Sequence, residues 1–149
     1  MDNLEIAQMT HEDIGEVVVI ENESFSVPWS YKSFEDSLNL KYGRFFVAKL
    51  DKKIGGYIGL YLVGDDGDIT NVAVSSDYRR KGIAGKLIEE VIMCAKENQL
   101  SFINLEVRPS NTSAINLYTK YGFEKLGIRK NFYTKPTEDA LIMQKEILK

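Results

Sequence analysis

The stretch "RRKGIAGKLIEEVI", residues 79–92, decides the fold of this chain. Three basic residues lead into two glycines separated by two residues. An apolar stripe with helical spacing then follows, at Leu87, Ile88, Val91 and Ile92. The pattern predicts a helix over about 81–98 whose first turn is basic and rich in small residues.

Segments on both sides of this helix have the apolar patterns of strands and helices. We predict strands over 4–9, 44–50, 54–63, 68–74, 102–107, 123–130 and 139–147. Further helices are predicted over about 11–23, 31–40 and 111–121. The first has a capping box at Thr10, the second is capped by Ser30, and Asn111 can cap the third.

The connections between these segments predict the fold class. The short turns "DKK" and "GDDG" join the strands 44–50, 54–63 and 68–74 and indicate an antiparallel meander. The helix that follows is a crossover, which makes the strands 68–74 and 102–107 parallel. We therefore expect an α/β (mixed α+β) fold of three layers, with a mixed, mostly antiparallel central sheet flanked by helices.

Length and composition limit the classes of function. The 149 residues suit one domain, 1–149, that buries roughly 70% of its unfolded surface. A net charge of −3 argues against a general nucleic-acid binder, and no apolar run reaches membrane-spanning length. No signal peptide is evident, and one cysteine suits a reducing compartment, so we expect a cytoplasmic protein. We also expect a monomer. One cysteine and one histidine also argue against a metal site.

The start of the helix 81–98 has the properties of an anion-binding site. A helix begins with about four backbone N–H groups that lack an internal partner, at the positive end of the macrodipole. Glycine and alanine let a ligand approach these groups closely. The stretch is not a Walker loop, because Leu87 stands where such a loop has Ser or Thr. The alternative is a solvated basic turn, although basic residues at this end oppose the dipole.

The hexapeptide "RRKGIA" resembles the R/Q-x-x-G-x-G/A motif of the GNAT superfamily of N-acetyltransferases. The resemblance covers nearly the whole chain, through "NVAVSSDYRRKGIAGKLIEEVI", "LEVRPSNTSAINLYTKYGFEKLGIRKNFY", "FSVPWS" and "EDALIM". Within the superfamily it points to the RimI-type ribosomal-protein alanine N-acetyltransferases. The chain has Phe132 and Thr134 where members of that group often have Tyr and Pro.

The resemblance implies a GNAT-like fold, acetyl-CoA as co-substrate and no metal. Backbone amides of the basic stretch would hold the pyrophosphate of coenzyme A, and the end of the strand 68–74 would offer an N–H to the acetyl carbonyl. A ligand lying along the helix 111–121 could also touch Asn111. The expected cofactor-binding residues are Val72, Ala73, Val74, Arg79, Arg80, Lys81, Gly82, Ile83, Ala84, Gly85 and Asn111.

Glu106 is the first candidate catalytic residue. In the strand 102–107 the residues Ile103, Leu105 and Val107 share one face, and Glu106 lies on the other, near the strand end where α/β sheets place ligands. The alternative is a solvated glutamate on an exposed face. The resemblance implies that Glu106 is the general base, which takes a proton from the α-ammonium before its nitrogen attacks the thioester.

Tyr118 is the second candidate. It lies seven residues after Asn111, on the same face of the predicted helix and about 10 Å farther along its axis. The alternative is a packing aromatic, which is the usual role of a tyrosine on a helix. The resemblance implies that Tyr118 is the general acid that protonates the departing thiolate.

The resemblance further implies direct transfer of acetyl from acetyl-CoA to the N-terminal alanine of a small-subunit ribosomal protein. Trp29 and Tyr133, the latter in a loop, would line the acceptor groove. Two alternatives remain: an acetyltransferase for another protein N-terminus or a small amine, and a coenzyme A-binding module without catalysis. We expect Cys94 to be a buried apolar filler and His11 to be a surface residue.

Overall fold

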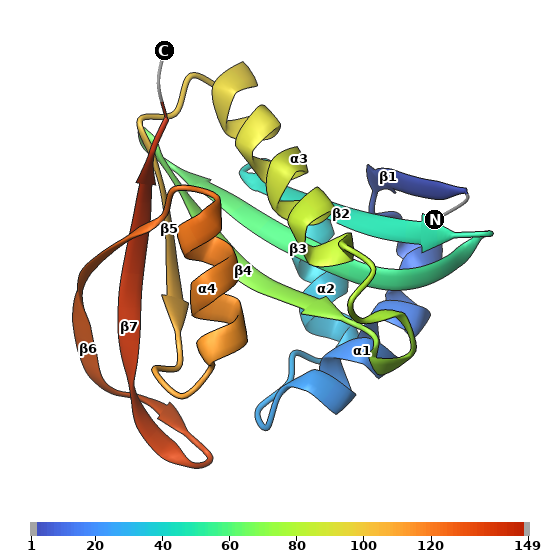
Figure 1. Ribbon diagram of the computed structural model, residues 1–149. Coiled ribbons are helices and arrows are strands. Elements are labelled where there is room, and N and C mark those ends of the chain that lie inside the picture. The colour runs from blue at the N-terminus through green and yellow to red at the C-terminus, as the bar shows by residue number, and fades with distance from the viewer. Residues whose placement is uncertain (1–2, 148–149) are drawn as a thin grey trace.

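The computed structural model describes residues 3–147, whose seven strands form one mixed sheet (Figure 1). The strands are β1 (Leu4–Gln8), β2 (Gly43–Leu50), β3 (Lys53–Val63), β4 (Asp66–Val74), β5 (Phe102–Val107), β6 (Glu124–Thr134) and β7 (Thr137–Glu146), in the order β1-β2-β3-β4-β5-β7-β6. The helices are α1 (Ile14–Ser24), α2 (Tyr31–Leu38), α3 (Ile83–Glu97) and α4 (Thr112–Lys120). Two short 3-10 turns lie at His11–Asp13 and Ser76–Tyr78.

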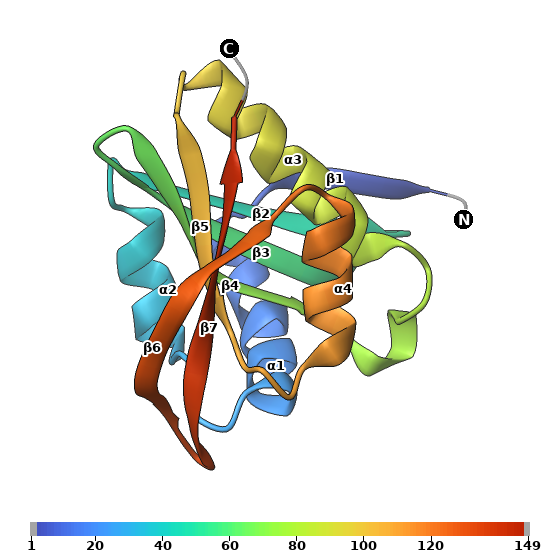
Figure 2. The same cartoon turned by 60° about the vertical axis from the view of Figure 1, so that its left-hand side comes forward.

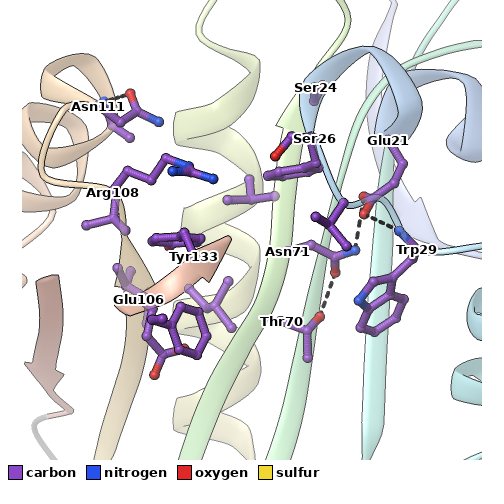
Figure 3. Close-up of a pocket in the computed structure, with 18 of the residues that line it drawn as sticks. Glu21, Ser24, Ser26, Trp29, Thr70, Asn71, Glu106, Arg108, Asn111 and Tyr133 are labelled. Atoms are coloured by element: carbon purple, nitrogen blue, oxygen red, sulfur yellow. Dashed lines mark hydrogen bonds between the residues drawn. The ribbon is translucent and has the colours of Figure 1, made fainter. Parts of the chain in front are cut away.

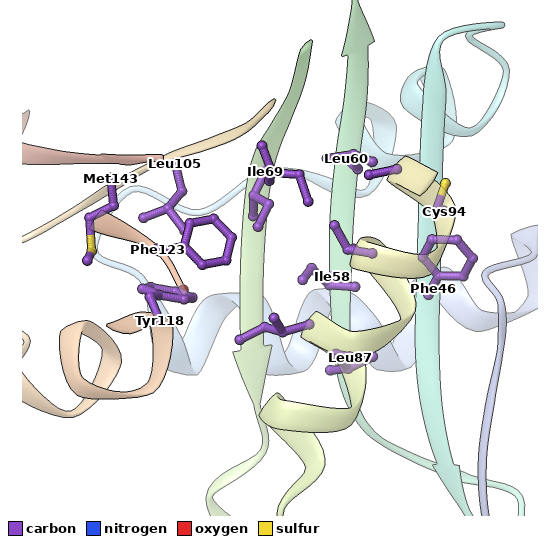
Figure 4. Packing of buried hydrophobic residues seen from close by; sticks show 14 of the residues in the cluster. Phe46, Ile58, Leu60, Ile69, Leu87, Cys94, Leu105, Tyr118, Phe123 and Met143 are labelled. Atoms are coloured by element: carbon purple, nitrogen blue, oxygen red, sulfur yellow. The ribbon is translucent and has the colours of Figure 1, made fainter. Parts of the chain in front are cut away.

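The helices cover both faces of the sheet, so the molecule has the three layers that the sequence predicts (Figure 2). One apolar core lies between the sheet and the helices α3 and α4 (Figure 4). A second lies between β2, β3 and the helices α1 and α2. Phe45 and Phe46 are neighbours on β2 and belong to different cores. Because β3 is covered on both faces, its sequence is a continuous apolar run rather than an alternating one.

The helix caps that the sequence predicts are present. Thr10 and Asp13 form the capping box that precedes α1. The Ser30 hydroxyl accepts a hydrogen bond from the Ser33 amide (3.1 Å), at the start of α2. The Asn111 side chain accepts one from the Ala114 amide (3.2 Å), so α4 begins directly after Asn111.

The strands β4 and β5 are parallel, as the crossover helix predicts, but they pair over three residues only. Asp66–Asp68 pair with Phe102–Asn104, and the two strands part beyond that point. The Asn104 amide nitrogen donates to Asp66 Oδ2 (3.0 Å) and Asp68 Oδ1 (3.2 Å), and its oxygen accepts from Gln144 Nε2 (2.9 Å). These side chains hold β4, β5 and β7 together at the closed end.

A bulge in β4 accounts for the parting. Gly59 pairs with Asn71 and Leu60 pairs with Ile69, which leaves Thr70 as an extra residue in β4. A bulge bends its strand and increases the local twist. From here β4 continues along β3, while β5 continues along β7 to Val107, so the two strands diverge.

The prediction for the C-terminal strands is wrong at one place. Residues 123–130 were expected to be a strand and Tyr133 to lie in a loop, but β6 continues to Thr134 and contains Tyr133. Arg129 pairs with Ala140 and Tyr133 with Glu138, so three residues of β6 bulge opposite one residue of β7. The bulge interrupts the alternation of side chains, and in a sequence pattern this resembles the end of a strand.

Cys94 and His11, the single cysteine and the single histidine, lie where the sequence analysis expects them. Cys94 lies on the buried face of α3, as predicted, and burial raises the pKa of its thiol. His11 is exposed. Within residues 3–147, no group of three or more metal-ligating side chains is arranged to hold a metal ion. None of the helices described is long and apolar enough to cross a membrane.

Candidate active site

A pocket of about 450 Å³ lies where β4 and β5 part (Figure 3). Its walls come from the end of α1, the α1–α2 loop, β4, β5, the start of α4 and β6. The lining brings together residues for which the sequence predicts catalytic, cofactor-binding and acceptor-binding roles. They are the candidate catalytic residues Glu106 and Tyr118, the expected cofactor contacts Val72 and Asn111, and the expected acceptor contacts Trp29 and Tyr133. Ala73, Val74 and the stretch 79–85 are not part of the lining and follow Val72 along the chain.

Glu106 lies on β5 and lines the pocket. Its neighbours Leu105 and Val107 are buried on the other face of the strand, as predicted, and also contribute to the lining. Its side chain is 30% exposed, and Oε2 accepts a long hydrogen bond from Arg129 Nη1 (3.4 Å). Arg129 is the only hydrogen-bond partner of the carboxylate in the part of the chain that the structure describes. Glu106 is therefore accessible from the pocket.

Tyr118 is both a core residue and a residue of the pocket lining. Its side chain is 6% exposed and its ring packs against Phe123 at 5.8 Å between centroids, within the core (Figure 4). The same residue lines the pocket. Burial raises the pKa of Tyr118, so its hydroxyl stays protonated at neutral pH.

Tyr133 forms the wall opposite Trp29 (Figure 3). The guanidinium carbon of Arg108 lies 4.3 Å from the centroid of the Tyr133 ring. Burial, and next the negative charge of Glu106, raise the pKa of Tyr133 to about 12, although Arg108 opposes the shift. Its phenol is thus neutral at any pH at which the fold is expected to function.

Glu21 is a residue of the site that the sequence analysis missed. It is 2% exposed, and its Oε1 accepts hydrogen bonds from the hydroxyl of Tyr57 and from Asn71 Nδ2 (3.2 Å). Its Oε2 accepts from the backbone amide of Trp29 (2.9 Å). The carboxylate thereby fixes the loop that carries Trp29 to the strands β3 and β4.

A signal for Glu21 was present in the sequence. Ile14, Val17 and Glu21 stand at i, i+3 and i+7 on α1, and all three are buried. A glutamate on the apolar face of a helix needs hydrogen-bond partners from elsewhere in the fold, because an unpaired buried charge is costly. Which residues supply them depends on contacts distant in sequence.

The basic stretch leads into three backbone amides without an intrahelical partner at the start of α3. The amides of Ile83, Ala84 and Gly85 precede the first intrahelical hydrogen bond, from the Lys86 amide to the Gly82 carbonyl (3.1 Å). Such amides are available to an anion. Arg79, Arg80 and Lys81 are exposed beside them.

The fold itself also explains why glycine stands at positions 82 and 85. Gly82 has φ +76°, a left-handed conformation that favours glycine whether or not a ligand is bound. A Cβ at Gly85 would lie 2.6 Å from the Tyr121 hydroxyl, which donates to Glu89 Oε2 (2.8 Å). The small size of Gly85 therefore allows α3 to pack beside Tyr121.

Comparison with known proteins identifies the family to which this fold belongs. The model of the acetyltransferase (GNAT) family matches residues 14–123. The chain belongs to this family, which confirms the fold and the family expected from the sequence.

Relatives with similar chains are ribosomal-protein acetyltransferases by name. A Bacillus subtilis protein, provisionally named ribosomal protein bS18-alanine N-acetyltransferase, is 40% identical over 93% of this chain and 92% of its own. The ribosomal protein bS18-alanine N-acetyltransferase of Escherichia coli K12 is 33% identical over 93% of this chain and 94% of its own.

Solved structures share the fold over nearly the full length. The crystal structure of the ribosomal-protein-S18-alanine N-acetyltransferase from Escherichia coli superposes with a TM-score of 0.90 at 31% identity, over 98% of this chain and 95% of that one. A GNAT family acetyltransferase from Elizabethkingia anophelis, solved with acetyl-CoA bound, superposes with a TM-score of 0.79 at 25% identity, over 98% and 99%.

Glu21→Gln tests the anchor of the Trp29 loop. The amide would place an NH₂ group among donors that now face a carboxylate, so at least one hydrogen bond is lost. We expect the free energy of unfolding to fall by about 1–3 kcal/mol. Because Trp29 is the single tryptophan, its fluorescence should also report a more solvated loop.

Urea denaturation measures the first effect and the emission maximum the second. Glu12→Gln, at an exposed glutamate in the turn before α1, is the matched control and should change neither. Unchanged stability and emission in Glu21→Gln would show that the carboxylate does not hold the loop.

Proposed function

We propose that this protein transfers the acetyl group of acetyl-CoA to the α-amino group of the N-terminal alanine of a ribosomal protein of the bS18 type. The observation that carries the proposal is the pocket between β4 and β5, which brings a carboxylate and a protonated phenol to one cavity between two aromatic walls. The printed names of the relatives from Bacillus subtilis and Escherichia coli support the choice of acceptor.

Acetyl-CoA would bind to backbone groups without hydrogen-bond partners at the start of α3 and along the edge of β4. The amides at the start of α3 and the side chains of Arg79, Arg80 and Lys81 would hold its pyrophosphate. Beyond Asp68, the edge of β4 that faces β5 has lost its strand partner, so its N–H and C=O groups need other partners. The edge at Val72, Ala73 and Val74 would bind the acyl end of the co-substrate, and Asn111 would contact it from α4.

The reaction that follows from these residues is a direct acyl transfer. Glu106 accepts a proton from the α-ammonium, directly or through water, and the freed nitrogen lone pair attacks the carbonyl carbon of the thioester. A backbone N–H of β4 stabilises the oxyanion. The carbon–sulfur bond breaks as the amide forms, and Tyr118 donates its hydroxyl proton to the leaving sulfur. The second proton that the nitrogen loses on becoming an amide returns through water to the Tyr118 phenolate. The raised pKa of Tyr118 makes it a weaker acid than an ordinary phenol, so its contribution should be modest.

The acceptor is tested with peptides and labelled acetyl-CoA. A peptide that begins with alanine should become labelled, whereas the same peptide with a blocked N-terminus and a free lysine should not. The α-amine loses its proton about 2.5 pKa units more easily than a lysine side chain, so one carboxylate base suffices near neutrality. Equal labelling of both peptides, located by mass spectrometry, would contradict the proposal.

Glu106→Gln tests the general base. The substitution keeps the shape of the side chain but cannot accept the proton, and loss of a general base typically lowers kcat by about 10²–10⁴-fold. The deficit should shrink as pH rises, because more of the amine is then already neutral. Glu97→Gln, at an exposed glutamate of α3, serves as control. Wild-type turnover of Glu106→Gln at pH 7 would assign the base to another group.

Tyr118→Phe separates the acid from the packing role, because it keeps the buried ring and removes the hydroxyl. We expect kcat to fall by about 10²-fold, the low end for a general acid, with the melting temperature and coenzyme A affinity preserved. Acyl donors with more acidic thiols should reduce the deficit. Tyr121→Phe loses a hydroxyl that bonds Glu89 outside the pocket lining and is the control. Equal deficits with all donors would return Tyr118 to a packing role.

A further inference from the structure

Arg108, the residue directly after β5, contacts the β6–β7 hairpin at four points. Its Nη1 donates to the carbonyl of Pro136 (2.9 Å) and pairs with Glu138 Oε1 (3.2 Å), and Nη2 donates to the carbonyl of Lys135 (3.4 Å). Its guanidinium carbon lies over the ring of Tyr133, 4.3 Å from the centroid. Arg108, a residue of the pocket lining, thus binds the turn that follows Tyr133.

Glu138, on the hairpin, accepts hydrogen bonds from the loop that carries Arg108. Its Oε2 accepts from the Ser110 amide (3.0 Å), and its Oε1 accepts from the Ser110 hydroxyl (3.1 Å) as well as from Arg108. Desolvation alone would raise the pKa of Glu138, but the hydrogen bonds from Ser110 and Arg108 outweigh it and lower that pKa. The carboxylate therefore stays charged near neutral pH.

The Arg108–Glu138 pair differs from an ordinary surface ion pair. The side chains of Arg108 and Glu138 are 24% and 23% exposed, whereas those of the pair Lys32–Asp36 are 79% and 62% exposed. An exposed pair on two flexible side chains contributes little, but a guanidinium with several hydrogen bonds and a stacked ring has one defined geometry. Arg108 is therefore built to hold a position.

The hairpin needs such a tether. β6 is an edge strand, and its bulge interrupts the pairing with β7 just before Tyr133. Among residues 3–147, the hydrogen bonds that reach the turn 133–138 from outside the hairpin come from Arg108 and Ser110. Both residues belong to the loop between Glu106 on β5 and Asn111 at the start of α4.

We propose that Arg108 is a positioning residue that holds the hairpin, and with it the Tyr133 ring, as the wall on which the acceptor peptide binds. The inference rests on the proposed function, because it assigns Tyr133 to the acceptor side. Arg108 acts through Tyr133 and not on the reacting atoms. It sets the KM for the acceptor, while Glu106 and Tyr118 set kcat.

Arg108→Lys tests the proposal with the charge preserved. Lysine lacks the planar guanidinium, which donates hydrogen bonds to two backbone carbonyls and to the Glu138 carboxylate. Its ammonium group also stacks less well on an aromatic ring. We expect the acceptor KM to rise on the order of tenfold, with kcat, coenzyme A affinity and melting temperature near their wild-type values. Arg44→Lys is the matched control, since Arg44 also donates to two backbone carbonyls, of Lys41 and Gly43, but does not line the pocket.

A double-mutant cycle shows whether Arg108 acts through Tyr133. Tyr133→Ala should raise the acceptor KM by itself, and adding Arg108→Lys to it should change KM little further. Independent, multiplicative effects on KM would overturn the proposal. So would a loss of coenzyme A affinity and melting temperature as large as the loss in KM, which would indicate a general structural role.

Hydrogen exchange supplies a readout that needs no acceptor. In Arg108→Lys the amides of 131–138 should exchange faster than in the wild type, while those of α3 should not change. If the wild type acetylates no peptide, the proposed function is wrong, and the exchange rates still decide whether Arg108 holds the hairpin. Unchanged exchange at 131–138 would overturn the inference.

Discussion

The parting of β4 and β5 is the constraint on which the rest of the site depends. The side chains around Asn104 tie the two strands together at one end, and the bulge at Thr70 bends β4 away at the other. Two strands that separate inside a sheet leave backbone N–H and C=O groups without partners. A sheet that opens in this way is stable in water only where the unpaired groups are solvated or meet a ligand.

Each wall of the opening is held by a buried or shielded charge. On one side the carboxylate of Glu21 accepts three hydrogen bonds and fixes the Trp29 loop. On the other, Arg108 and Glu138 hold the hairpin that carries Tyr133. Polar networks of this kind define a geometry when every member is satisfied and are costly when one member is lost. The candidate acid and base lie between two walls whose positions are fixed in the same way.

The elements of the fold follow from local patterns and were predictable. The caps at Thr10, Ser30 and Asn111 and the crossover after β4 place most helices and strands to within a few residues. Glu106 and Tyr118 could be identified because each lies at a recognisable position in its own element, and the structure places both in one pocket. Their catalytic roles come from the family resemblance, because neither pattern distinguishes a catalytic side chain from a solvated or packing one.

The parts that could not be predicted depend on contacts between distant residues. Tyr133 was assigned to a loop because a bulge hides the continuation of β6. The partners of Glu21, and the pair formed by Arg108 and Glu138, join residues that are far apart in the chain. The sequence explained Gly85 by anion binding alone. Its close approach to Tyr121 is a second reason for a glycine there, and it comes from tertiary packing. Pattern and spacing describe single elements, and these features belong to the junctions between them.

The central claim is that the opening between β4 and β5 joins the co-substrate to the acceptor amine. The most direct measurement is the crystal structure of the protein bound to a conjugate in which the sulfur of coenzyme A is linked through an acetyl bridge to the nitrogen of an alanine peptide. The pyrophosphate should lie on the amides at the start of α3, the bridge between Glu106 and Tyr118, and the peptide between Trp29 and Tyr133. A conjugate bound outside the opening, or with its bridge remote from Glu106 and Tyr118, would contradict the claim.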